Sequence, residues 1–284
     1  MITILIPTDF SKNAWNAIRY AMDFFKSEDC TFYFLNTYTP PFYRIDYGLG
    51  GLAYSAIPDM GVDVSLAGLE QTVMVLKKEF RNSRHRFETL SAFNTLTGEI
   101  TAICQRMKVD LIVMGTQGAT GAKEIFLGSN TVHVIRKAEV AVMAIPVHYT
   151  YREIRSVLFP TDYLTHYKKN ELRIMVDIVK KHEAKLTVLH VKEEYDMTAV
   201  QQENRKFLAA QCKHLQTNFE EMKGNLMPDA IHAYILEHDP DLLALMNRKH
   251  SFFERLLMKQ HIDSIGFHAQ IPFLIMPETV ELSK

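Results

Sequence analysis

Small and hydroxyl-bearing residues in the first half of the chain have the types and spacing to bind a phosphate. Gly115–Gly118 has the sequence GTQG, and after nine intervening residues Gly128–Thr131 has the sequence GSNT. Two glycines three positions apart permit a tight turn and a close approach of the backbone to a ligand. The second segment opens a helical pattern, where free backbone N–H groups and hydroxyls bind anions, phosphates above all. The spacing therefore predicts two phosphate-contacting elements in one site.

The element that must position these residues is a buried strand. The apolar run Leu111–Met114 directly precedes the first glycine, and such a run bounded by a turn is typical of a buried strand. Open α/β sheets bind ligands outside the carboxyl ends of their strands. The motif thus stands where such a sheet would place a ligand.

A strand followed by Pro-Thr-Asp occurs twice in the chain. Pro7–Asp9 follows the apolar run Ile2–Ile6, and Pro160–Asp162 follows the run Ser156–Phe159. A helical pattern and then a second strand-like run come after each of them. This order indicates that the chain contains two copies of one unit.

The ends of the two copies match as well. Asp110 and Asp241 are 131 positions apart, and so are Pro146 and Pro277. The repeating unit is therefore a whole domain rather than a short solenoid repeat. We place the boundary in the polar linker His148–Glu153 and expect one domain over residues 1–148 and a second over residues 152–284.

Strands that alternate with helices predict βαβ units and a parallel sheet. In the first copy we expect five strands, over residues 2–6, 31–38, 87–93, 110–114 and 140–145. The helices are expected over residues 11–26, 64–82, 98–108 and 129–137. The fold class is therefore α/β, with two open five-stranded sheets in tandem.

The second copy is shorter between its second and fourth strands. Pro228–Asp239 fits either the third strand, over residues 230–236, or the third helix. Both are hard to fit, because a strand there would leave about five residues before Asp241, too few for a helical crossover. We expect one element of this copy to be reduced or missing, and the pattern does not decide which.

Composition restricts the class of protein. The chain has 284 residues, of which 47% are apolar, enough for two domains with real cores. The net charge of −1 gives no electrostatic reason to expect nucleic acid or an anionic membrane as a partner. No apolar run approaches the length of a membrane span, and we interpret the N-terminus as a first strand. Cys30, Cys104 and Cys212 are odd in number and widely spaced, which favours reduced thiols and a cytoplasmic protein.

No dedicated catalytic or metal-binding pattern is found. The chain has no GxxxxGK(S/T) P-loop, and the first turn after a strand, PTDFS, lacks the GxGxxG of a dinucleotide site. The histidines have no metal-ligand spacing, and no serine has nucleophile-elbow spacing. We therefore expect no catalytic residues, no metal ligands and no enzyme, with slow hydrolysis of a bound nucleotide as the alternative.

Asp9 has two possible roles. It can cap the helix that follows, or it can contact a ligand. Ser11 can itself cap that helix, which favours a ligand-contacting role for Asp9 and a structural role for its counterpart Asp162.

Together these residues resemble the universal stress proteins in their tandem two-domain form. The family motif G-x2-G-x9-G-(S/T) is filled by Gly115, Gly118, Gly128 and Ser129, and the Pro7–Asp9 turn also matches. The resemblance implies an adenine-nucleotide alpha-hydrolase-like fold, with strand order 3-2-1-4-5 and helices on both faces of each sheet. It also implies ATP, or the related AMP or ADP, as the ligand, with Mg²⁺ accompanying the nucleotide.

The resemblance further implies which residues contact the nucleotide. Thr8 and Asp9 would lie beside the adenosine, Thr37 would contact adenine, and Met114 and Gly115 would flank the nucleoside. The phosphates would lie against the glycines and the helix start. The full expected set is Pro7, Thr8, Asp9, Thr37, Met114, Gly115, Gln117, Gly118, Gly128, Ser129, Asn130 and Thr131. Thr37 and Asn130 depart from the family pattern, which commonly has an aliphatic residue and Val there.

The second copy lacks the phosphate motif. In the 131-residue frame, Met246, Lys249, Lys259 and Gln260 replace the two glycines of the turn, the third glycine and the serine. Side chains then occupy positions where backbone would have to approach a ligand. We expect no ATP in this half, and we interpret 247–255 as a basic amphipathic helix start with a solvated face.

The closing strands give the degenerate copy a role. Residues 140–145 and 271–276 are apolar runs, and an exposed apolar edge strand is a pairing liability. Dimers of the family commonly pair these strands antiparallel. We therefore expect an intramolecular pseudo-dimer through the two closing strands, and a homodimer of whole chains is also possible.

The sequence supports one function and two rivals. The first is a universal stress protein that binds one adenine nucleotide in its N-terminal domain and acts as a nucleotide-responsive stress regulator. The second is an interaction or scaffold protein of the same fold that binds no nucleotide. The third is a slow ATPase.

Overall fold

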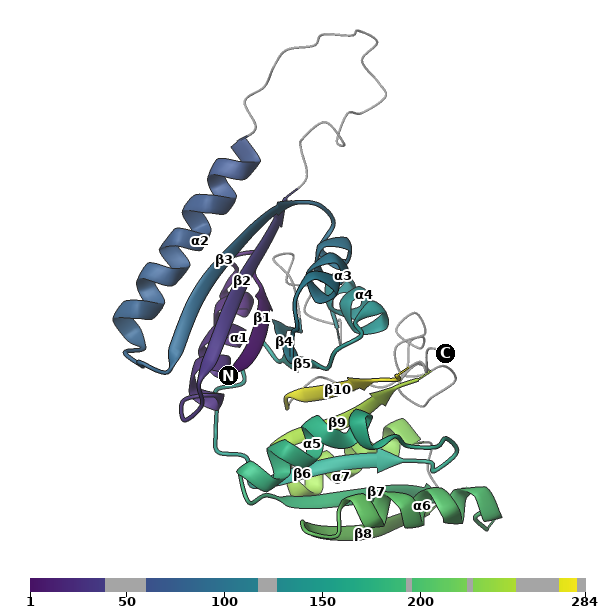
Figure 1. Cartoon of the computed structure of the whole chain (residues 1–284). Coiled ribbons are helices and arrows are strands. Elements are labelled where there is room, and N and C mark those ends of the chain that lie inside the picture. The colour runs from purple at the N-terminus through teal and green to yellow at the C-terminus, as the bar shows by residue number, and fades with distance from the viewer. Residues whose placement is uncertain (39–59, 117–126, 193–195, 224–226, 249–270, 280–284) are drawn as a thin grey trace, which may run out of the picture.

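The computed structural model describes residues 1–38, 60–116, 127–192, 196–223, 227–248 and 271–279. Ten strands and seven helices lie in these ranges (Figure 1). The strands are β1 (Ile2–Pro7), β2 (Cys30–Tyr38), β3 (His85–Phe93), β4 (Leu111–Gly115), β5 (Val142–Ile145), β6 (Ser156–Thr161), β7 (Lys185–Lys192), β8 (Gln216–Lys223), β9 (Leu242–Asn247) and β10 (Phe273–Pro277). The helices are α1 (Lys12–Phe24), α2 (Met60–Glu79), α3 (Leu96–Arg106), α4 (Ser129–Lys137), α5 (Lys169–Lys181), α6 (Ala199–Gln211) and α7 (Met227–His238).

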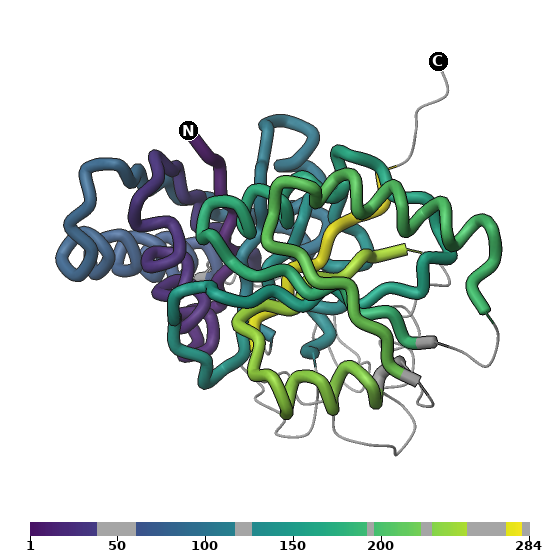
Figure 2. The backbone as a smooth tube through the Cα atoms, turned by 90° about the horizontal axis from the view of Figure 1, so that it is seen from below, coloured from purple at the N-terminus to yellow at the C-terminus, as the bar shows by residue number. Residues whose placement is uncertain are grey.

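All ten strands form one sheet, in the order β3-β2-β1-β4-β5-β10-β9-β6-β7-β8. Each half has the strand order 3-2-1-4-5, so the α/β class and the order are confirmed. The two half-sheets are continuous because β10 pairs antiparallel with β5, with Leu274 opposite Met143. Figure 2 shows β10, in yellow, near the middle of the molecule, between the purple N-terminal half and the green part of the C-terminal half.

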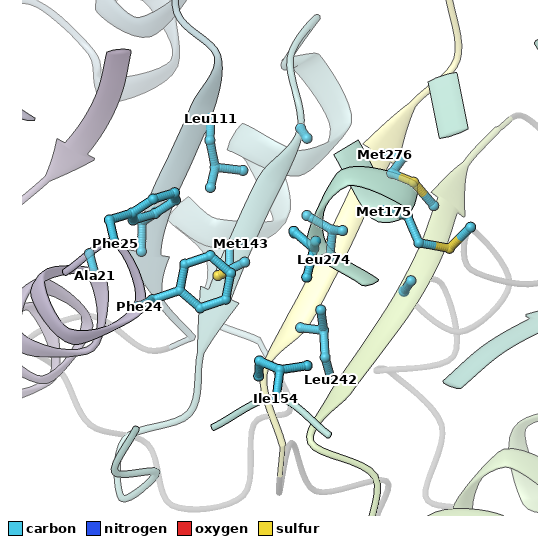
Figure 3. Close-up of a cluster of buried hydrophobic side chains, with 14 of the residues drawn as sticks. Ala21, Phe24, Phe25, Leu111, Met143, Ile154, Met175, Leu242, Leu274 and Met276 are labelled. Atoms are coloured by element: carbon cyan, nitrogen blue, oxygen red, sulfur yellow. The ribbon is translucent and has the colours of Figure 1, made fainter. Parts of the chain in front are cut away.

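Helices cover both faces of the sheet (Figure 1). Buried residues of α1, α2, α5 and α6 belong to one apolar cluster, and those of α3, α4 and α7 belong to another on the opposite face. The first cluster crosses between the halves, since it contains Phe24 of α1, Met143 of β5 and Leu274 of β10 (Figure 3). The two copies thus share a hydrophobic core.

The second copy has both elements that were hard to fit. Residues 227–238 form the third helix, α7, and the third strand is β8, which lies upstream and pairs parallel with β7. The expectation that one element is missing was wrong. The strand was overlooked because Gln216–Lys223, with the sequence QTNFEEMK, has little apolar alternation. It is one of the two edge strands of the sheet, where polar and charged residues are tolerated and prevent further pairing.

The internal repeat is visible in matched contacts. Asp110 Oδ2 accepts a hydrogen bond from the N–H of Thr3 at 2.9 Å, and Asp241 Oδ2 accepts one from the N–H of Ser156 at 2.9 Å. Each aspartate ties the start of the fourth strand of its copy to the start of the first.

None of the helices in the described ranges combines the length and apolar character needed to cross a lipid bilayer.

Candidate functional site

The carboxyl ends of three neighbouring strands bring the first expected residues together. Pro7 pairs with Leu35 of β2, and the N–H of Thr8 donates to the Leu35 carbonyl at 2.8 Å. On its other side β1 pairs with β4, with Leu5 opposite Ile112. Continuing this register places Pro7 opposite Met114, so the Pro7–Asp9 turn and Gly115 share one edge of the sheet.

Local hydrogen bonds fix the turn after β1. Thr8 is buried, and its Oγ1 accepts the N–H of Phe10 at 3.0 Å. Asp9 Oδ1 accepts the N–H of Ser11 at 3.0 Å. Ser11 is the N-cap of α1, since its Oγ accepts the N–H of Ala14 at 3.2 Å. Asp9 is therefore not the cap, and its side chain is exposed beyond the carboxyl end of β1.

The second copy repeats this turn. Thr161 Oγ1 accepts the N–H of Tyr163 at 2.9 Å, and Asp162 Oδ1 accepts the N–H of Leu164 at 3.0 Å. Phe10 and Tyr163 even share a left-handed backbone, with φ of 61° and 54°. The Pro-Thr-Asp turn is thus a structural feature of both halves and does not by itself define a ligand site.

Gly115 ends β4 against the side chain of Asn13. A Cβ atom at position 115 would lie 2.5 Å from Asn13 Nδ2, closer than side-chain atoms approach in folded proteins, so only glycine fits. Asn13 lies in the first turn of α1 and is buried. Sequence reasoning missed this residue, and its only signal was a polar side chain beside the buried Ala14 on the helix.

The helix after the glycine motif begins without a side-chain cap. Gly128 is the N-cap of α4, and no side chain caps its backbone. The N–H of Gly128 donates to the Thr116 carbonyl at 2.7 Å, which ties the helix start to the end of β4. Ser129 and Asn130 follow and are exposed. The first N–H groups of a helix have no partner within it, so the start of α4 offers backbone hydrogen-bond donors.

Thr131 has a different environment from the one expected. It is 2% exposed, and its hydroxyl donates to the Gly115 carbonyl at 3.0 Å. The side chain therefore holds α4 against the end of β4. Its backbone N–H still belongs to the first turn of the helix.

The remaining expected residues lie around this edge or outside the described ranges. Thr37 is half-buried near the end of β2, opposite Ala92 of β3. Met114 is 5% exposed and belongs to an apolar cluster with Leu127. Gln117 and Gly118 lie outside the described residues, as do Lys249, Lys259 and Gln260 of the second half.

In the second half a buried ion pair lies beyond the end of β9. Arg248 is 4% exposed, and its Nη2 lies 2.5 Å from Oε2 of Glu171 in α5. Its Nη1 donates to Thr165 Oγ1 at 2.5 Å, and the guanidinium lies 5.2 Å from the centre of the Tyr167 ring. Burial also raises the pKa of Tyr167. The interpretation of this stretch as a solvated helix start was wrong for residues 247 and 248, because β9 continues to Asn247 and Arg248 packs inward.

A separate hollow of about 600 Å³ lies at the end of β7 in the second half. It is lined by His190, Asp196, Met197, Gln202, Arg205, Lys206, Ala209 and Glu221. His190 Nδ1 lies 3.0 Å from the Thr161 carbonyl, in the place where Asn36 Nδ2 donates to the Thr8 carbonyl at 2.7 Å. Acidic and basic side chains both line the hollow, so its charge favours neither anions nor cations.

The described residues form no evident metal-binding group. Among the described residues, no three or more His, Cys, Asp or Glu side chains gather in a way that could hold a metal ion. The uncapped helix start, the exposed Asp9 carboxylate and the glycine at the end of β4 remain the features that could receive a ligand.

Comparison with known proteins agrees with this architecture. Two universal stress proteins of Methanocaldococcus jannaschii are each 27% identical to half of the chain, over 80% and 93% of their own lengths. The crystal structure of a universal stress protein from Archaeoglobus fulgidus superposes with a TM-score of 0.70 at 19% identity, over 98% of both chains. A protein of unknown function from Pseudomonas aeruginosa superposes with a TM-score of 0.59 at 14% identity, over 97% of this chain and 92% of its own. The model of the universal stress protein family matches twice, over residues 1–146 and 153–277, and the chain therefore belongs to the universal stress protein family.

Proposed function

We propose that the first half binds one adenine nucleotide (ATP, or the related AMP or ADP) with Mg²⁺ as an accompanying ion. The observation that carries this proposal is the start of α4, which has Gly128 as its N-cap, no side-chain cap and two exposed polar residues after it. A helix start of this kind is suited to phosphate, because its N–H groups and its dipole both favour an anion.

The residues at the carboxyl ends of β1, β2 and β4 and at the start of α4 each have a role in this proposal. Ser129 and Asn130 with the backbone of the helix start would contact phosphates, together with Gln117 and Gly118. Pro7, Thr8 and Asp9 would lie along the nucleoside, with Thr37 near the base and Met114 and Gly115 on the other side. Thr131 contributes its backbone N–H, while its hydroxyl holds the helix in place.

The role proposed for the bound nucleotide is regulation. The chain belongs to the universal stress protein family, and on that basis we propose a non-enzymatic, nucleotide-responsive stress protein of the cytoplasm. The second half would act as a built-in dimer partner, because β10 supplies the antiparallel neighbour of β5.

Isothermal titration with ATP and Mg²⁺ tests the proposal, with an expected stoichiometry of one nucleotide per chain. Asp9→Ala should weaken binding, while Asp162→Ala should leave it unchanged. The pair is matched, because both carboxylates accept one backbone N–H at 3.0 Å in the same turn. Gly128→Val should abolish binding. It should not unfold the protein, because the φ of −62° and ψ of 152° at Gly128 suit a β-branched residue.

Several outcomes would contradict the proposal or favour one of its rivals. Binding of two nucleotides per chain, or equal effects of Asp9→Ala and Asp162→Ala, would contradict the one-site assignment. No binding by gently purified protein would favour the interaction or scaffold protein. Turnover of ATP that is lost in Asp9→Ala would favour the slow ATPase.

A further inference from the structure

Phe10, the residue after Asp9, has a backbone conformation that needs support. Its φ is 61°, and the left-handed region is unfavourable for a bulky residue other than glycine. The N–H of Phe10 is held by Thr8 Oγ1 at 3.0 Å. Such strain persists only where the surroundings over-determine the conformation, so the contacts of the Phe10 ring must help to hold it.

The ring packs against the backbone of α2 at Gly68. A Cβ atom built at Gly68 would lie 2.4 Å from Phe10 Cζ and 2.5 Å from Cε2. Glycine inside a helix costs about 1 kcal/mol relative to alanine. The contact gives a physical reason for accepting that cost, because any larger residue at position 68 would require the Phe10 ring to move.

Helix α2 is itself fixed to the sheet near this contact. The hydroxyls of Ser65 and of Ser91 in β3 lie 2.7 Å apart, and Ser65 is 1% exposed. Leu69 and Leu76 are buried in the apolar cluster below the helix. The position of α2 therefore determines where the Phe10 ring can lie.

We propose that Phe10 and Gly68 are positioning residues that couple α2 to the ligand-contacting turn, so that displacement of α2 changes nucleotide affinity. This inference rests on the proposed nucleotide site. If the ring is pushed out, Phe10 leaves the left-handed region and its N–H leaves Thr8 Oγ1. The adjacent N–H of Ser11 then shifts away from Asp9, and the carboxylate loses its orientation toward the ligand edge.

The second half offers a comparison for this contact. Tyr163 has the same left-handed backbone, and the residue is 1% exposed. There Asn204 of α6 donates a hydrogen bond to the Tyr163 carbonyl at 2.7 Å. In the first half the ring of Phe10 packs against a glycine of α2, so the covering helix contacts the turn differently in the two halves.

A double-mutant cycle tests the coupling. Gly68→Ala should raise the dissociation constant for ATP by about tenfold, the equivalent of about 1.4 kcal/mol. Phe10→Gly removes the ring and tolerates the left-handed backbone. In that background, adding Gly68→Ala should have no further effect on the dissociation constant. Ala67→Ser is the matched control, because it adds one heavy atom at the exposed neighbouring position of α2 and should leave affinity unchanged.

Amide hydrogen exchange gives a readout that needs no nucleotide. In the free protein, Gly68→Ala should accelerate exchange at the Phe10 and Ser11 N–H groups, while the exchange of β1 stays unchanged. If the wild-type protein binds no ATP, the proposed function fails, but the exchange result still decides the coupling. Unchanged exchange in Gly68→Ala, or an equal effect of Gly68→Ala on affinity with and without the Phe10 ring, would overturn the inference.

Discussion

At the scale of single residues, Gly115 and Asn13 form a close steric contact where β4 ends. The strand end and the helix approach so closely that the Asn13 amide occupies the space of a side chain at position 115. The glycine is needed here for internal packing, whether or not a ligand also approaches it.

This contact predicts the effect of a single added methyl group. Gly115→Ala should lower the free energy of unfolding by about 1–3 kcal/mol, the usual cost of overpacking a filled site. Urea unfolding of the wild type and Gly115→Ala measures this loss of stability. In an Asn13→Ala background the same substitution should cost much less, because the clashing amide is gone. Equal costs in both backgrounds would show that the contact is not responsible.

The three cysteines give a second prediction at this scale. Burial raises the pKa of the Cys30 thiol to about 12, with a further contribution from Glu28, and raises that of the Cys212 thiol to about 11. Cys104 is only partly buried, although burial raises its pKa too. Because the thiolate is the reactive form, iodoacetamide should modify Cys104 first in the native protein.

Mass spectrometry of the labelled protein measures this order. Cys30 and Cys212 should react only after denaturation, so native labelling should stop at one group per chain. Rapid native labelling of Cys30 would show that β2 opens readily.

The expected site residues were predicted unequally well from sequence. The turn after β1 and the start of α4 follow from residue types, because Asp, Ser and Gly are favoured in turns and at helix N-caps. Thr131 could have been recognised as inward-facing, since it precedes the buried Val134 and Ile135 by three and four positions. The contact of Asn13 with Gly115 could not have been predicted from the sequence, because it depends on how closely α1 approaches β4.

At the scale of elements, apolar pattern predicted the interior strands and the edge strand β3, and it failed for β8 at the opposite edge. The apolar runs of β1, β4 and β9 lie in the interior of the sheet, where both faces are covered. β8 lies at the edge and is polar, so its sequence lacks the signal. The segment 230–236 was ambiguous because a short apolar run fits a strand or a helix equally well.

The buried ion pair between Arg248 and Glu171 gives an element-scale prediction. Besides Arg248, the Glu171 carboxylate accepts N–H groups of Lys168 and Thr279, so it joins α5, the end of β9 and the chain after β10. Arg248→Met should lower the free energy of unfolding by about 3–5 kcal/mol, because it leaves a buried carboxylate without its partner.

Two further variants test that explanation. Glu171→Gln combined with Arg248→Met should cost less than Arg248→Met alone, since no buried charge remains. Arg106→Met, which breaks an exposed pair with Glu99 at 3.0 Å, should cost no more than about 1 kcal/mol. If the double variant were the less stable one, packing rather than charge would explain the loss.

At the scale of the whole molecule, several contacts join the two copies. Among them are the antiparallel pairing of β5 with β10 and the packing of the end of α1 against the end of α5. Lys181 forms an ion pair with Glu28 and lies 5.1 Å from the centre of the Phe24 ring. His182, the C-cap of α5, lies 5.2 Å from the same ring.

His182 makes this junction sensitive to acid. Burial lowers the pKa of its imidazole, and the neighbouring Lys181 lowers it further, against smaller opposing effects of Glu153 and Glu28. A folded-state pKa below the unfolded value means that the unfolded chain binds the proton more readily. The free energy of unfolding should therefore fall as pH decreases below about 6.5, the ordinary histidine value, and level off below the lowered pKa.

Urea unfolding of the wild type and His182→Gln over this range measures the contribution, and the variant should lose this part of the pH dependence. A His232→Gln variant, which changes a histidine of α7 on the opposite face, is the control and should retain it. Equal pH slopes in the wild type and His182→Gln would place the acid sensitivity elsewhere.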